Sequence, residues 1–100
     1  MTIDELMAVF NDENTDEFLK FERVPSERRK SNRPDLHAFI VLDSLVPSTT
    51  DIVCAAEHDE IYLGVDINAL AEVVDEQTAI DLVRCGVRLD EYDEGLCMFV

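Results

Sequence analysis

The sequence contains no tryptophan and has only three glycines, three prolines, three cysteines and eight basic residues among its 100 residues. No apolar stretch approaches the roughly 18–20 residues that a membrane-spanning helix needs. The first five residues carry no lysine or arginine of the kind that opens a signal peptide. The sequence therefore predicts neither a membrane protein nor a secreted one.

The scarcity of glycine and aromatic residues excludes several kinds of site. Gly64, Gly86 and Gly95 are isolated, so the sequence has neither G-x-G-x-x-G nor a Walker loop to hold phosphates, and G-x-S-x-G is absent too. Two tyrosines without a tryptophan offer no platform on which bases or sugars could stack. We expect no cofactor.

The three cysteines cannot all pair, and their spacing builds no disulfide framework, which suits a reducing cytoplasm. Cys54 and His58 lie four residues apart on a predicted strand and would share one face of a regular strand. Cys85, Cys97 and His37 could complete a set of metal ligands, but only the Cys54/His58 pair approximates zinc-site spacing. We interpret the thiols as ordinary and expect no metal. A small metal- or thiol-dependent enzyme that uses Cys54 and His58 remains the alternative.

Charge is the strongest signal in the composition. The 23 acidic residues against eight basic ones give a formal charge of −15. After Arg33 there are 15 acidic residues but only Arg84 and Arg88 as cations. Such a surface repels phosphate backbones and anionic lipids, so we expect no direct nucleic-acid or membrane binding. The acid either serves solubility or imitates nucleic acid inside the basic groove of a partner.

Most of the basic residues lie together. Residues 25–33 read as a polar loop that contains Arg28, Arg29, Lys30 and Arg33. Because this loop precedes a strongly acidic chain, we expect it to fold against that chain as an internal counterion rather than to bind nucleic acid. The acidic face of a homologous neighbour is an alternative target.

The first half of the chain shows two helical patterns. Thr2 and Glu5 form a capping box in front of an apolar stripe, which predicts an N-terminal helix within residues 1–16 whose attachment to the domain the sequence leaves open. Residues 17–24 fit a strand or a helix, and we favour the strand. Pro34 suits the first position of a helix that is apolar nearly all round and runs to Val46. We interpret it as a buried central helix, and a strand is the alternative.

The second half predicts two hairpins separated by two helices. The strands at residues 51–57 and 60–65 join through a short turn, and Asp66 and Asp75 cap the helices that follow. Gly86 ends the second helix, and residues 87–90 and 96–100 form a last hairpin. The pattern predicts one α+β domain over residues 1–100, with helices on one face of a small, mostly antiparallel sheet built from hairpins.

Acidic residues gather at the two predicted hairpin turns. Neither cluster follows a calcium-loop pattern. The two tips would adjoin if the hairpins pair. The candidate interaction residues are Glu57, Asp59, Glu60, Asp90, Glu91, Asp93 and Glu94.

Several stretches resemble a group of small, uncharacterised bacteriophage and prophage proteins over roughly residues 17–100. The stretches are 18–24 (FLKFERV), 31–39 (SNRPDLHAF), 56–61 (AEHDEI) and 82–87 (LVRCGV). That group carries no assigned activity, so no functional residue transfers. The resemblance implies a phage setting in a bacterial host cytoplasm, where small acidic inhibitors that imitate DNA are a recurrent type.

These observations together predict a non-enzymatic interaction protein. Its expected partner is a protein. In the narrower hypothesis the chain is a nucleic-acid mimic, and the partner is a basic, nucleic-acid-binding host protein that it inhibits. A structural or assembly component of a phage, which could form a homo-oligomer, is a further alternative.

Overall fold

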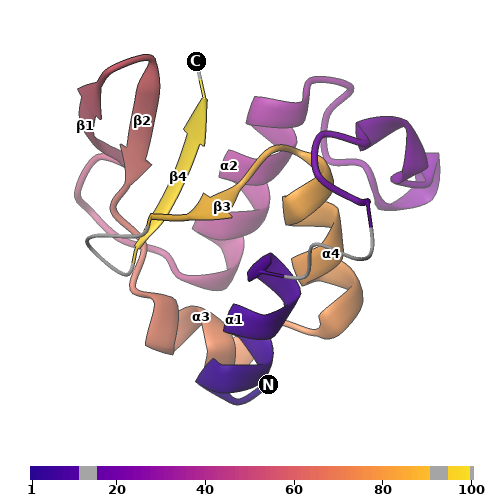
Figure 1. Ribbon diagram of the computed structural model, residues 1–100, viewed down its shortest axis with the longest axis horizontal. Helices are drawn as coiled ribbons and strands as arrows, with labels where there is room; N and C mark the ends of the chain where they lie inside the picture. Colours follow the sequence, from indigo (N-terminus) through magenta and orange to yellow (C-terminus); the bar gives the residue numbers. More distant parts are fainter. Residues whose placement is uncertain (12–15, 91–94, 100) are drawn as a thin grey trace.

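The computed structural model describes residues 1–11, 16–90 and 95–99. Within these ranges the four strands form one antiparallel sheet in the order β1-β2-β4-β3. In Figure 1 the sheet occupies the upper left, and the helices lie to its right and below it. The predicted α+β class is confirmed. The elements are α1 (Ile3–Asn11), η1 (Phe21–Arg23), η2 (Ser26–Arg28), α2 (Pro34–Leu45), β1 (Val53–Glu57), β2 (Glu60–Leu63), α3 (Ile67–Val73), α4 (Glu76–Arg84), β3 (Arg88–Leu89) and β4 (Leu96–Phe99).

The helix ends form as the sequence predicts. The Glu5 backbone N–H donates to Thr2 Oγ1 at 3.1 Å, and the Thr2 N–H donates to the Glu5 carboxylate at 2.9 Å, which completes the capping box of α1. Asp66 and Asp75 accept backbone N–H bonds at the starts of α3 and α4. Gly86 follows α4 with φ +97°, a conformation that glycine adopts without steric cost.

The core lies between the helices and one face of the sheet. Leu63 of β2 and Leu96 of β4 are paired in register, and both are buried. They belong to one apolar cluster with Leu42 of α2 and Leu82 of α4. Leu6 of α1 is fully buried in the same cluster, so the N-terminal helix is part of the packed domain.

The predicted strand at residues 17–24 is wrong. The chain there turns at Leu19, which has φ 62°, and then forms the 3-10 helix η1. The Leu19 N–H donates to the carbonyl of Val83 at 3.3 Å, so the segment is fixed against α4 and not against a strand. Contacts with a distant helix override the local alternation of the sequence.

Helix α2 occurs where the sequence predicts it, but it is not buried all round. His37, Ala38, Val41 and Leu42 face the core. Leu36 and Ile40, one turn apart, are each 42% exposed. One apolar side of this helix therefore meets solvent in the described structure.

Candidate functional site

The β1–β2 hairpin leaves an open edge on the sheet. β1 pairs with β2 and is one of the two edge strands of the described sheet, and all five of its residues are exposed. Figure 1 shows the hairpin standing at one side of the molecule, away from the helices. An edge strand presents backbone N–H and C=O groups that can pair with another chain.

The turn of this hairpin has two residues in the left-handed region. His58 has φ 50° and Asp59 has φ 63°, the arrangement of a type I′ turn, and Glu57 is paired with Glu60 across it. Such a turn matches the twist of the strands but favours Asn-Gly over other residues. The predicted two-residue connection is confirmed, and it carries some backbone strain.

Relief of that strain gives a stability prediction. We expect the free energy of unfolding of the His58→Asn/Asp59→Gly variant to exceed that of the wild type by about 1 kcal/mol, because Asn and Gly adopt positive φ more readily. Urea titration followed by circular dichroism measures the change. His58→Asn/Asp59→Ala is the control and should gain no stability. Equal stability of both variants would contradict the turn assignment.

The three candidate acids of this hairpin differ in their surroundings. Glu57 and Asp59 are exposed, with His58 Nε2 lying 3.0 Å from a Glu57 oxygen. Glu60 is instead in an ion pair with Arg88 of β3, and the Tyr62 hydroxyl donates to it at 3.2 Å. Glu57 and Asp59 therefore present their charge to solvent, whereas that of Glu60 is partly neutralised.

The two hairpins pair through β2 and β4. β2 and β4 are antiparallel, with Glu60 opposite Phe99 and Leu63 opposite Leu96. The β1–β2 turn therefore lies at the Phe99 end of the sheet. Asp90 and Gly95, which bond at 2.8 Å, flank the second turn at the Leu63 end.

Three steps along β2 separate these two ends by about 10 Å. The described residues that flank the two turns therefore lie at opposite ends of β2, and the expectation that the tips adjoin stays a prediction. Glu91, Asp93 and Glu94 lie outside the described residues.

The basic loop folds in part against the acidic chain, as predicted. Arg28 Nε donates to Asp81 of α4 at 2.9 Å, and a second nitrogen donates to the same carboxylate at 3.2 Å. Arg29 bonds the carbonyls of Val24 and Phe21, and its guanidinium lies 4.6 Å from the Phe21 ring centre. Among the described residues, Lys30 and Arg33 form no ion pair.

Cys54 and His58, the residues of the alternative enzyme site, occupy different local structures. Cys54 occupies an irregular position between Val53 and Ala55, and its thiol donates to the Tyr62 carbonyl at 3.3 Å. His58 lies in the turn, so the two side chains do not share the face of a regular strand. Within the ranges that the structure describes, no three His, Cys, Asp or Glu side chains gather closely enough to hold a metal ion.

The three free cysteines should differ sharply in reactivity. Cys54 is exposed, while Cys85 and Cys97 are buried. Burial raises the pKa of Cys85 to about 12 and also raises the pKa of Cys97. The thiolate is the reactive form. We expect a disulfide reagent at pH 8 to label one thiol per native chain quickly and the other two only on unfolding. Rapid labelling of Cys54→Ser would contradict this assignment.

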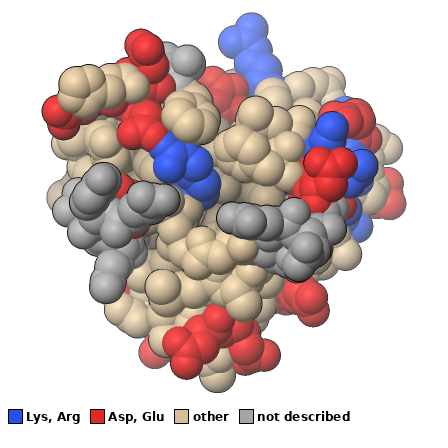
Figure 2. All heavy atoms as spheres, in the orientation of Figure 1, with Lys and Arg blue, Asp and Glu red and all other residues tan. Residues whose placement is uncertain are grey.

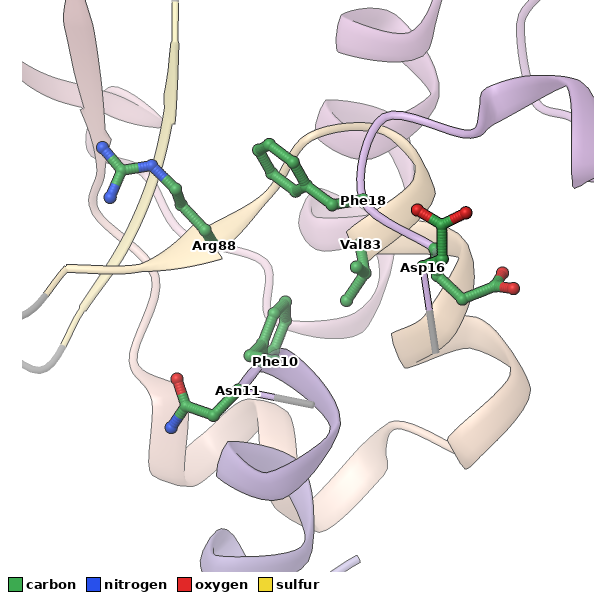
Figure 3. A pocket seen from close by; sticks show the side chains of 7 residues that line it. Phe10, Asn11, Asp16, Phe18, Val83 and Arg88 are labelled. Carbon is green, nitrogen blue, oxygen red and sulfur yellow. The ribbon is translucent and has the colours of Figure 1, made fainter. Parts of the chain in front are cut away.

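A second feature is a hollow of about 350 Å³ between α1, α4 and the segment before η1. Figure 3 shows Phe10, Phe18 and Val83 facing this hollow, while the Arg88 guanidinium points away from it. Glu17 also lines it, but Arg84 and Arg23 bind its carboxylate and lower its pKa. Glu17 is therefore held as an ion-paired anion, which suits neither a general acid nor a general base near neutral pH.

No helix in the described ranges has the length and apolar composition to span a bilayer. Comparisons of the chain with protein-family models, with curated proteins and with solved structures give no match.

Proposed function

We propose that this chain is a non-enzymatic interaction protein that binds a basic partner protein through its β1–β2 hairpin. The observation that carries the proposal is that every residue of β1 is exposed. This strand is an open sheet edge that ends in the exposed acids Glu57 and Asp59. The exposed backbone N–H and C=O groups can pair with a partner at short range, and the acids attract a basic partner at long range.

The overall charge supports a basic partner. A formal charge of −15 on 100 residues steers cations toward the molecule and speeds their encounter at low salt. The position of His58 in the turn, off the strand that holds Cys54, and the ion pairs that hold Glu17 favour this role over a thiol- or metal-dependent enzyme.

Imitation of nucleic acid is a narrower form of the same proposal. It needs carboxylates in a row that follows a phosphate backbone. Figure 2 shows the acidic side chains of one face in separate groups, one of them over the hairpin tip. This distribution favours the docking of a basic segment at the hairpin over the imitation of a whole duplex. The phage setting that the sequence resemblance implies makes a host protein in the bacterial cytoplasm the first partner to test.

The test is retention of bacterial lysate proteins on the immobilised chain at low and moderate salt. We expect the wild type to retain basic proteins at low salt. Glu57→Gln/Asp59→Asn should retain at least about tenfold less, since each lost charge contact contributes on the order of 1 kcal/mol. Glu22→Gln/Glu72→Gln removes the same charge from exposed residues of η1 and α3 and should behave like the wild type.

Equal losses in both variants would show that diffuse charge, not the hairpin, binds the partner. Absence of any basic protein even at low ionic strength would sink the proposal. Release of the partner by a short DNA duplex would support the mimic form, and the lack of such release would leave docking at the hairpin alone.

A further inference from the structure

At the exposed edge of β1, one residue in particular directs its backbone N–H and C=O groups outward. In a two-residue hairpin the residues that flank the turn form a hydrogen-bonded pair, and pairs alternate along the strands. Glu57 and Glu60 flank the turn, so the next pair, Ala56 and Ile61, is non-bonded. The N–H and C=O of Ala56 therefore point away from β2, toward the open edge.

The side chains at this edge are small. Ala55 and Ala56 are both small and exposed, so another backbone can approach within the ~4.8 Å spacing of paired strands. In the described sheet no strand lies beyond β1.

A groove lies beside the start of the same strand. A hollow of about 400 Å³ is bounded by Phe39, Ile40 and Asp43 of α2 and by Thr50, Asp51 and Ile52, which run directly into β1. Ala56 lies opposite Ile61, which packs against the core, so its side chain points to the helix side of the sheet. Apolar side chains of an added strand would point the same way, toward the groove.

Charge decides what kind of chain fits. Asp51 and Asp43 border the groove, and Glu57 and Asp59 stand at the other end of β1, all of them exposed. A second copy of this chain would bring its own acids beside these and add its full negative charge, which opposes pairing. Lysine or arginine side chains on the outer face of an added strand would instead meet Glu57, which points to the face opposite that of Ala56.

We propose that β1 takes up an extended segment of the basic partner as a fifth strand. The segment alternates apolar side chains, directed to the α2 groove, with lysine or arginine directed to the outer face of the sheet. This inference rests on the proposed function and adds to it the conformation and composition of the bound segment.

The experiment uses an eight-residue peptide of alternating lysine and valine, with blocked ends, and measures its affinity for the full chain at low salt. A second peptide of the same sequence carries a methyl group on every amide nitrogen. We expect the methylated peptide to bind at least about tenfold more weakly, because it keeps its charge but cannot pair as a strand.

Protein variants separate the backbone from the charge. Ala56→Pro removes the outward N–H without removing a bond to β2, and it should weaken binding of the unmethylated peptide about tenfold. Ala56→Val keeps the N–H and should bind like the wild type. Circular dichroism checks that both variants fold. The methylated peptide tests the need for strand pairing on the wild-type protein alone.

The outcomes distinguish the two proposals. Equal binding of both peptides, together with a loss in Glu57→Gln/Asp59→Asn, would overturn strand addition while retaining the acidic hairpin as the binding site. No loss in any hairpin variant would overturn the proposed function as well. A wild-type chain that sediments as a dimer which Ala56→Pro dissociates would assign the edge to a second copy and overturn this inference.

Discussion

Replacement of Asp81 by alanine should lower the free energy of unfolding by about 3 kcal/mol. The Asp81 side chain is only 4% exposed and accepts bonds from two arginines, Arg28 and Arg84. Arg84 is 15% exposed, so the loss of Asp81 leaves a largely buried guanidinium with fewer acceptors. An uncompensated buried charge costs more than the pair contributes, because water cannot replace the missing partner.

The measurement is thermal and urea unfolding of Asp81→Ala against Glu72→Ala, which removes an exposed acid of α3. A loss of about 3 kcal/mol corresponds to a fall in Tm of roughly 12–24 °C for a domain of this size. The control should change by less than about 0.5 kcal/mol. Similar small losses in both variants would show that the ion-pair network with Arg28 and Arg84 contributes little.

Mild acid should destabilise the protein through His37. This side chain is 2% exposed, and its Nδ1 accepts a bond from the Lys30 N–H at 3.0 Å, which requires the neutral ring. Burial lowers the pKa of His37 below its ordinary 6.5, and the positive charges of Lys30, Arg29 and Arg28 lower it further, against the opposing effect of Asp81. The folded protein therefore resists protonation that the unfolded chain accepts.

The stability of the protein should fall as the pH drops below about 6.5. Below pH ~6.5 the unfolded chain binds a proton at His37 that the folded chain does not, so stability falls as the pH drops toward the folded-state pKa. The slope approaches 1.36 kcal/mol per pH unit in that window. Above pH ~6.5 this contribution is fully present.

Unfolding free energies at pH 7.5 and 5.5 test this prediction. His37→Asn keeps an acceptor for the Lys30 N–H but cannot titrate, so the difference between the two pH values should shrink in the variant. If wild type and variant lose the same stability over this range, another group is responsible.

Local chemistry made much of this fold predictable. Helix starts at Thr2, Asp66 and Asp75, and the helix end at Gly86, depend on residues within one turn of the chain, so sequence alone identifies them. The same holds for the two-residue turn at 58–59. The strand prediction for residues 17–24 was wrong because Glu17 and Leu19 contact α4, more than 60 residues away, and these contacts set the conformation of the segment.

The candidate site was only partly predictable for the same reason. Glu57, Asp59 and Glu60 lie close together in the sequence. Only the strand order, in which β2 and β3 both pair with β4, brings Arg88 to Glu60 and partly neutralises it. The register that places the flanking residues of the two turns at opposite ends of β2 is likewise a long-range property.

Sequence reasoning also missed the groove beside β1. The exposed side of α2 looked like core in the sequence, because an apolar helix shows which residues could be buried but not which neighbours are present. Ile40 and Asp51 are brought together only by the path of the chain into β1.

The most direct test of the account is hydrogen exchange at the Ala56 backbone amide, with and without saturating lysine–valine peptide. We expect this N–H to exchange readily in the unbound protein and at least about tenfold more slowly in the complex, while exchange of the Glu72 amide in α3 is unchanged. Unchanged exchange at Ala56 in a saturated complex would contradict it.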